Sequence, residues 1–222
     1  MPNRLLVIGL DCAPPELVFE RYRDRLPNLS SLLADSLYAR LESTVPPITV
    51  PAWASMFSGK DPGTLGIYGL RNRTDYTYNS MAIANADWVK EPSVWDLLGA
   101  AGHRSILVGV PQTYPLRPIN GVAISSFLTP GPESTYTYPD SLKAEVETVA
   151  APYLIDVPDF RTDQKDRVLA DIREMTTKRF RVTRHLIETR EWEFAVHVEM
   201  GTDRINHAFW RYADPSHRDY TP

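Results

Sequence analysis

Residues 5–10 read Leu-Leu-Val-Ile-Gly-Leu (LLVIGL), a continuous apolar run rich in branched side chains, and Asp11 follows it directly. A run of this length and composition is typical of a β-strand buried on both faces, as in a parallel sheet covered by helices. Similar runs recur at residues 105–110, 121–126 and 193–200. The sequence therefore predicts a sheet whose first strand is the 5–10 segment.

The segments between these runs carry helical patterns. Ser93 precedes an apolar pattern that stops at Gly102, and Asn28 is the predicted N-cap of a helix that ends near residue 36. Residues 163–190 repeat apolar side chains at intervals of three and four, which predicts a long amphipathic helix. Residues 38–42 alternate weakly and predict another strand. Alternating strands and helices indicate an α/β fold, with a mostly parallel central sheet and helices on both faces.

Composition limits the function. The 222 residues have a net charge of −4, which provides no basic surface for nucleic acid. No segment approaches the roughly 20 apolar residues that span a bilayer, and the first apolar run is too short for a signal peptide. We therefore expect no membrane association and a cytoplasmic location. The single cysteine, Cys12, excludes an internal disulfide and is expected to be a half-buried structural residue.

Two aspartates follow predicted strands. Asp11 comes directly after the first strand, and Asp203 follows the last strand by a Gly-Thr turn. Because parallel strands end at the same edge of a sheet, both carboxylates are expected on one rim. Asp203 and His207 are four residues apart, so a helix places them on one face, where they form a suitable metal-binding pair. An aspartate after a strand is also a common helix cap, and such Asp–His pairs are often surface hydrogen bonds. His197 is expected to be a packed core histidine.

Residues 43–68 (STVPPITVPAWASMFSGKDPGTLGIY) place Thr49 at the start of a short helix that contains Pro51. A threonine in this position is first of all a capping residue. The same position favours an anion, because the helix dipole and the first N–H groups point toward it. A metal ion bound to the Thr49 hydroxyl would turn that hydroxyl into a nucleophile. The capping and nucleophile interpretations are compatible.

In this order, these motifs resemble the alkaline phosphatase superfamily, and more closely its type I phosphodiesterase/nucleotide pyrophosphatase branch. The resemblance spans nearly the whole chain. It rests on five segments: VIGLDCAPPELV (7–18), LPNLSSLLADS (26–36), STVPPITVPAWASMFSGKDPGTLGIYG (43–69), WDLLGAAGHRSILVGVPQTYP (95–115) and TDRINHAFWRY (202–212). The Asp-Gly pair usual after the first strand is Asp-Cys in this chain.

The resemblance implies a role for each matching residue. Asp11 and the Thr49 oxygen would bind one metal ion, and Asp203 with His207 would bind the second. Thr49 would be the nucleophile, and the reaction would proceed through a phosphothreonine. Asn72 would contact phosphate oxygens. The implied cofactors are two divalent ions, zinc or manganese, and the implied substrate is a small phosphate ester or nucleotide.

The family completes its two-metal site with a further Asp-His pair and a His from its C-terminal half. Residues 1–222 contain no such segment, so we expect a single α/β domain that is truncated at its C-terminus and compatible with a homo-oligomer. The expected activity is that of a phosphodiesterase or nucleotide pyrophosphatase. The alternatives are a phosphomonoesterase or phosphomutase of the same superfamily, and a non-catalytic module that binds an anion or assembles with a partner.

Overall fold

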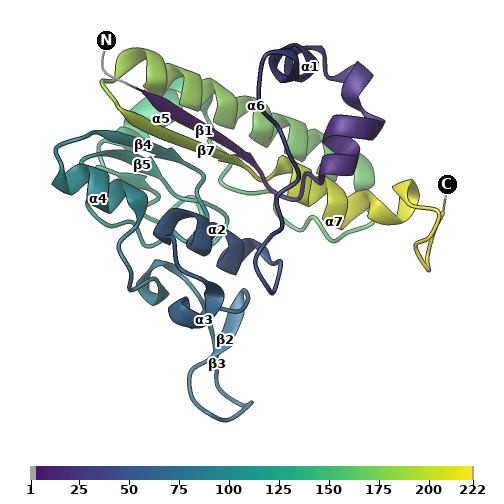
Figure 1. Cartoon of the computed structure of the whole chain (residues 1–222), viewed down its shortest axis with the longest axis horizontal. Coiled ribbons are helices and arrows are strands. Elements are labelled where there is room, and N and C mark those ends of the chain that lie inside the picture. Colours follow the sequence, from purple (N-terminus) through teal and green to yellow (C-terminus); the bar gives the residue numbers. More distant parts are fainter. Residues whose placement is uncertain (1–3, 222) are drawn as a thin grey trace.

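The computed structural model describes residues 4–221 and contains a central five-stranded sheet with the strand order β1-β7-β4-β5-β6 (Figure 1). The first four strands run parallel, and the short β6 pairs antiparallel at the far edge. The predicted mostly parallel sheet is therefore confirmed. Its strands are β1 (Leu5–Leu10), β7 (Phe194–Glu199), β4 (Ser105–Val108), β5 (Gly121–Ile124) and β6 (Thr137–Tyr138).

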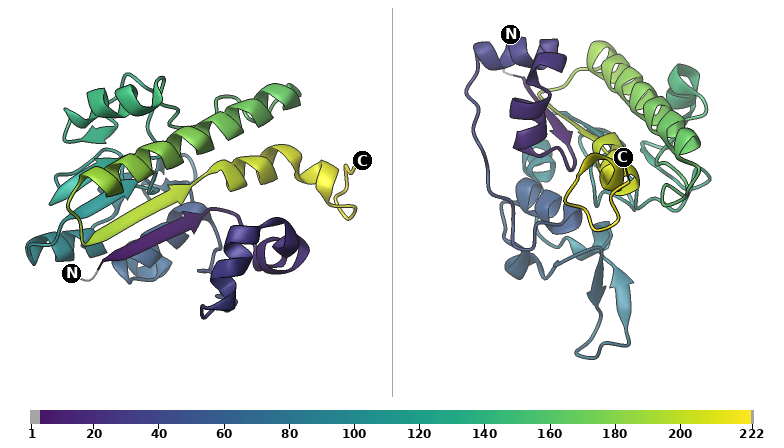
Figure 2. Two further views of the ribbon diagram at one scale, coloured as in Figure 1. Left: turned by 90° about the horizontal axis from the view of Figure 1, so that it is seen from above. Right: turned by 90° about the vertical axis from the view of Figure 1, so that its right-hand side faces the viewer.

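Helices cover both faces of this sheet, as predicted (Figure 2). The long α6 (Lys165–Thr189) and α5 (Leu142–Ala150) pack on one face, where they join a cluster with alternate residues of β4. Two helices pack on the other face: α2 (Thr49–Ser58), through its aromatic side chains, and α4 (Val94–Ala100). Each helix buries its apolar stripe against the strands, which stabilises the fold by roughly 25 cal/mol per Å² of apolar surface removed from water.

The remaining elements lie around the ends of the sheet. The antiparallel pair β2–β3 projects away from it as a hairpin (Figure 1). The last helix, α7, begins two residues after β7 ends and continues in nearly the same direction. These elements are η1 (Glu16–Arg21), η2 (Arg23–Arg25), α1 (Pro27–Ala34), α3 (Pro62–Leu65), β2 (Arg71–Arg73), β3 (Met81–Ile83), η3 (Ala86–Trp88) and α7 (Gly201–Ala213).

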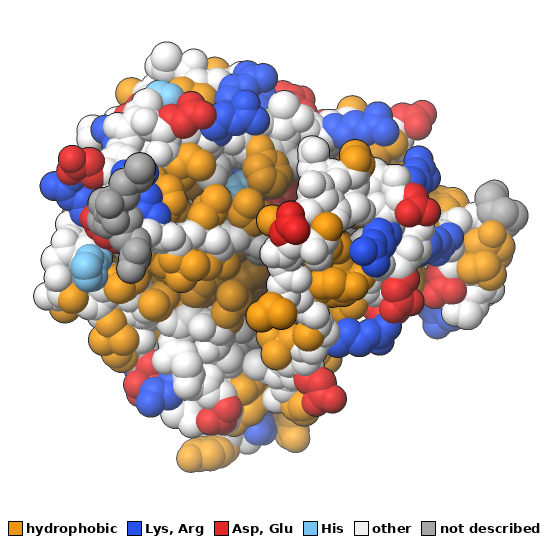
Figure 3. Space-filling view, turned by 45° about the horizontal axis from the view of Figure 1, so that its top comes forward, with side chains coloured by type: hydrophobic (Ala, Val, Ile, Leu, Met, Phe, Trp, Pro, Cys, Tyr) orange, Lys and Arg blue, Asp and Glu red, His pale blue; other side chains and the backbone are white. Residues whose placement is uncertain are grey.

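β1 is an edge strand, and the expectation that it is buried on both faces is wrong. In residues 4–221 it pairs only with β7, and Leu5 and Ile8 are more than half exposed. Figure 3 shows hydrophobic side chains gathered on this face of the molecule. A continuous apolar run fits an edge strand and a central strand equally well, so pattern alone could not separate them. The strands buried along their whole length are β7 and its neighbour β4, in the middle of the sheet.

Two local expectations near the N-terminus are also wrong. Residues 38–42 form no strand, since no neighbouring strand offers them hydrogen bonds in the described structure. Helix α1 begins at Pro27 with Leu26 as its N-cap, so Asn28 lies inside the helix and does not cap it.

The prediction that Ser93 begins the helix α4 is confirmed, because Ser93 N donates to Asp96 Oδ2 (2.7 Å) in a capping box. Within residues 4–221, no helix combines the length and the apolar character needed to cross a bilayer.

His197 is fully buried in β7, which confirms it as a core histidine. Its Nδ1 lies 2.7 Å from Thr183 Oγ1, and its ring stacks on Phe180 with a centroid distance of 4.2 Å. Burial, with a contribution from the charge of Arg179, lowers the pKa of His197 below its ordinary value, although Glu199 opposes this shift. The folded protein therefore holds this imidazole neutral at a pH where the unfolded chain protonates it.

The free energy of unfolding should accordingly fall as the pH drops below about 6.5. Below this pH, His197 binds a proton in the unfolded chain but stays neutral in the folded protein. Urea unfolding at about pH 7.5 and about pH 5.5 measures this dependence. We expect the wild type to lose more stability across this interval than His197→Gln does. Equal pH dependence in the two proteins would contradict the assignment.

Candidate active site

The carboxyl ends of β1 and β7 bring Asp11 and the start of α7 together. Asp11 N donates to Glu199 O (3.0 Å), which extends the β1–β7 pairing by one residue. Two side chains of α7 then hold the chain after β1: Thr202 Oγ1 donates to Asp11 O, and Asn206 Nδ2 donates to Cys12 O (2.6 Å). The backbone that carries Asp11 and Cys12 is thus fixed to the helix that carries Asp203 and His207.

Thr49 is the first residue of α2 and donates from Oγ1 to Asp11 Oδ2 at 3.1 Å. The other oxygen of this carboxylate accepts from Trp53 Nε1 at 2.9 Å. Thr49 and Trp53 are one helical turn apart, so one face of α2 presents both donors to Asp11. Ile48 is the N-cap residue, and no side chain caps the helix, so the interpretation of Thr49 as the capping residue is wrong.

The start of α2 has hydrogen-bonding capacity that the helix does not use. The intrahelical bonds begin where Ala52 N donates to Ile48 O (3.0 Å), and Pro51 has no N–H. The N–H groups of Thr49 and Val50 therefore have no acceptor within the helix. Together with the helix dipole, they favour negative charge beside the Thr49 hydroxyl.

Asp203 is nearly buried, and its two oxygens have different partners. Oδ1 accepts from Cys12 Sγ at 3.1 Å and lies 3.4 Å from His207 Nε2. The predicted placement of Asp203 and His207 on one helix face is therefore confirmed. Oδ2 pairs with Arg204 Nη1. Cys12 as a whole residue is exposed, so the expectation that the residue is half-buried is wrong. Its sulfur, however, is turned toward Asp203 and is partly shielded from solvent.

Arg204 and Asp156 are parts of this site that the sequence did not reveal. Arg204 is buried, and its Nε and Nη2 donate to the two oxygens of Asp156 at 2.7 and 2.6 Å. With Asp203 as its other partner, the guanidinium bridges two carboxylates. The position of Arg204 next to Asp203 in the sequence could have indicated that Arg204 belongs to the site. Asp156, in contrast, comes from a loop whose path no sequence pattern predicts.

Negative charge is crowded around Asp11. Burial and the nearby Asp203 raise the pKa of Asp11 above its ordinary value, against the hydrogen bonds from Trp53 and Thr49. Partial burial and the hydrogen bond to Asp203 raise the pKa of the Cys12 thiol to about 12. Ligand atoms of Asp11, Cys12 and Asp203 all lie within 4.8 Å of one another. Carboxylate and thiolate are ligands that zinc accepts, so this donor set fits a divalent metal ion.

Asn72 lies in β2 and is buried. Its Oδ1 accepts from Tyr68 N and its Nδ2 donates to Gly69 O, both at 2.8 Å. The amide thus closes the turn that leads into β2, and the contacts described for it do not join it to the Thr49–Asp11 group. Its role toward a substrate stays a prediction.

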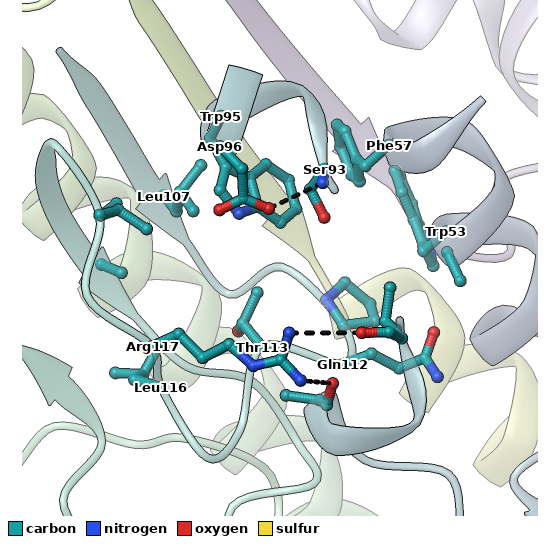
Figure 4. Close-up of a pocket in the computed structure, with 16 residues that line it drawn as sticks. Trp53, Phe57, Ser93, Trp95, Asp96, Leu107, Gln112, Thr113, Leu116 and Arg117 are labelled. Carbon is teal, nitrogen blue, oxygen red and sulfur yellow. Dashed lines mark hydrogen bonds between the residues drawn. The ribbon is translucent and has the colours of Figure 1, made fainter. Parts of the chain in front are cut away.

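A cavity of about 50 Å³ lies behind Trp53, between α2, α4 and β4 (Figure 4). Trp53 and Phe57 form one side, and Gln112 and Arg117 lie across from them. Of the described residues, the lining includes Trp53 but none of the four predicted metal ligands. This cavity is therefore behind the site, and Trp53 separates the two.

A second, larger hollow of about 320 Å³ borders His207. Arg161, Lys165 and Arg211 line it, with Asp163 as the only acidic residue of the lining. The hollow therefore has a net positive charge. A positive recess beside His207 favours the binding of an anionic group there.

Comparison with known proteins identifies the family of the chain. The model of the type I phosphodiesterase/nucleotide pyrophosphatase family matches residues 5–221. A search of curated proteins found no significant match.

Two similar solved structures are of phosphonoacetate hydrolase from Sinorhizobium meliloti 1021. The complex with phosphonoformate has a TM-score of 0.63 and 15% sequence identity, over 93% of this chain and 52% of that one. The complex with phosphonoacetate has a TM-score of 0.62 and 16% identity, over 89% and 46%. At this identity the match establishes the fold, and the chain spans about half the length of these structures. The chain belongs to the type I phosphodiesterase/nucleotide pyrophosphatase family.

Proposed function

We propose that this protein is a metal-dependent hydrolase of phosphate esters, of the phosphodiesterase or nucleotide pyrophosphatase type, in which Thr49 is the nucleophile. The observation that carries the proposal is the hydrogen bond from Thr49 Oγ1 to Asp11 Oδ2, at the positive end of α2. This bond orients the hydroxyl oxygen, while the adjacent helix N-terminus favours the negative charge of a phosphoryl group.

Four residues would hold two divalent ions, zinc or manganese. Asp11 and Thr49 would bind one ion, and Asp203 and His207 would bind the other. When bound, the ions would act as Lewis acids that neutralise charge on the phosphoryl oxygens. Arg204, by pairing with Oδ2 of Asp203, would leave Oδ1 directed toward Cys12 and His207.

The reaction would then be two displacements at phosphorus. Thr49 Oγ forms a bond to phosphorus while the bond from phosphorus to the leaving alcohol oxygen breaks, and the proton of the Thr49 hydroxyl goes to the leaving alcohol. Water then attacks the phosphothreonine, the bond to Thr49 Oγ breaks, and the hydroxyl regains its proton. The positive hollow beside His207 supports an anionic substrate. The phosphoryl group stays anionic through both displacements, so the same positively charged surroundings favour its binding in each step.

Turnover of a substrate panel tests this proposal. We expect the zinc- or manganese-loaded protein to hydrolyse bis(p-nitrophenyl) phosphate, and chelation followed by dialysis to lower the rate at least about 100-fold, with recovery on adding metal back. Faster hydrolysis of p-nitrophenyl phosphate would favour the phosphomonoesterase alternative. Phosphonoacetate, the ligand of one similar structure, completes the panel. No metal-dependent turnover of any substrate would favour the non-catalytic binding module.

A further inference from the structure

We propose that Cys12 is a third protein ligand of the metal ion held by Asp203 and His207, so that this ion has a thiolate in its coordination shell. The inference rests on the proposed metal site and adds to it a residue outside the predicted ligand set. Cys12 is the only cysteine of the chain. Its sulfur is therefore the only source of a thiolate ligand.

The geometry that carries the inference converges on Asp203 Oδ1. Cys12 Sγ lies 3.1 Å from this oxygen and His207 Nε2 lies 3.4 Å from it. Ligand atoms bound to one tetrahedral zinc ion are separated by roughly 3.3–3.5 Å. Ligand atoms of Cys12, Asp203 and Asp11 all lie within 4.8 Å of one another, so an ion bound at Asp203 Oδ1 has the Cys12 sulfur within reach. On binding, the ion replaces the proton that Sγ now shares with Oδ1, and that proton is released to solvent.

The approach of these atoms is fixed by the backbone. Asn206, one residue before His207, donates a hydrogen bond to Cys12 O. Thr202, one residue before Asp203, donates a hydrogen bond to Asp11 O. Any movement of the α7 ligands therefore carries Cys12 with it. Cys12 also has φ +55°, a left-handed conformation that is unfavourable for a residue with a β-carbon relative to glycine. Glycine would fill this turn at lower cost, but it would provide no sulfur.

A thiolate changes which ions the site prefers. Sulfur ligands favour zinc and cobalt over manganese and magnesium, which prefer oxygen. The Asp203 ion is thus expected to be zinc-selective. The ion bound by Asp11 and Thr49, with oxygen ligands only among these residues, is expected to discriminate less.

Cobalt substitution tests the proposal on the intact protein. We expect wild-type protein titrated with Co²⁺ to develop an intense near-ultraviolet thiolate-to-cobalt charge-transfer band that is absent from Cys12→Ser. The serine variant should also bind zinc more weakly, by at least about tenfold, since loss of an outer-shell partner alone costs 10–100-fold. A second readout is alkylation of the single thiol by N-ethylmaleimide, which zinc should slow at least about tenfold in the wild type.

Cys12→Gly is the matched control for folding. Because glycine adopts a positive φ without strain, this variant should unfold at the same or a higher denaturant concentration than the wild type while lacking the charge-transfer band. If the wild type bound cobalt without showing the charge-transfer band, or if zinc did not slow alkylation of the Cys12 thiol, the role of Cys12 would be overturned. The proposed function would then still stand. No bound cobalt in any variant would overturn the metal site itself, and with it both proposals.

Discussion

Thr49→Ala is expected to lower kcat by at least about 1,000-fold on any substrate that the wild type hydrolyses. The change removes the oxygen that would attack phosphorus. In the described structure, no other hydroxyl group is bonded to the Asp11 carboxylate, whose second donor is the indole N–H of Trp53. Stability should change by less than about 1.5 kcal/mol, because Thr49 contributes one hydrogen bond and does not cap the helix. Turnover and urea unfolding of the same preparation separate the two effects.

Thr49→Ser is the matched control. It keeps a hydroxyl group at the same position, so we expect it to retain turnover within about tenfold of the wild type. Incubation with substrate followed by acid quenching should leave a phosphorylated residue at position 49 in the wild type and the serine variant, and none in the alanine variant. If Thr49→Ala kept more than a tenth of the wild-type rate, Thr49 would not be the nucleophile.

The predictions that succeeded depend on short-range patterns. The long α6, the buried β7 and the capped start of α4 each carry their signal within a few consecutive residues. The spacing of Asp203 and His207 is of the same kind, since a helix of any context places residues four apart on one face. The mostly parallel sheet follows from the order of such elements.

The predictions that failed depend on neighbours that come from elsewhere in the chain. Whether β1 lies inside the sheet or at its edge is decided by which strands pair with it, and residues 38–42 lack a strand to pair with. The Cys12–Asp203 contact joins residues 191 positions apart. Asp156 reaches Arg204 from a loop with no periodic pattern. Burial and pairing of this kind are tertiary properties, to which local propensity contributes little.

Arg204→Met is expected to destabilise the protein by about 3 kcal/mol or more, the largest stability effect that we predict for the site. The substitution removes a buried cation from between Asp156 and Asp203 and leaves the nearly buried Asp203 without its Oδ2 partner. Methionine keeps much of the side-chain volume beside Phe160, over which the guanidinium now lies at 4.4 Å. The loss is therefore electrostatic and not a cavity effect. Urea denaturation with metal removed measures it directly.

Arg211→Met provides the comparison, because Arg211 lies two turns further along the same helix and is substantially exposed. Its pairing with Asp163 spans 3.8 Å between side chains that are 43% and 98% exposed, so its removal should leave stability nearly unchanged. Equal effects of the two substitutions would contradict a special role for the Asp156–Arg204–Asp203 bridge. Removing Arg204 also leaves two carboxylates whose repulsion a bound cation would relieve. Zinc should consequently restore more stability to Arg204→Met than to the wild type, which links the bridge to the metal site by a measurement that does not depend on turnover.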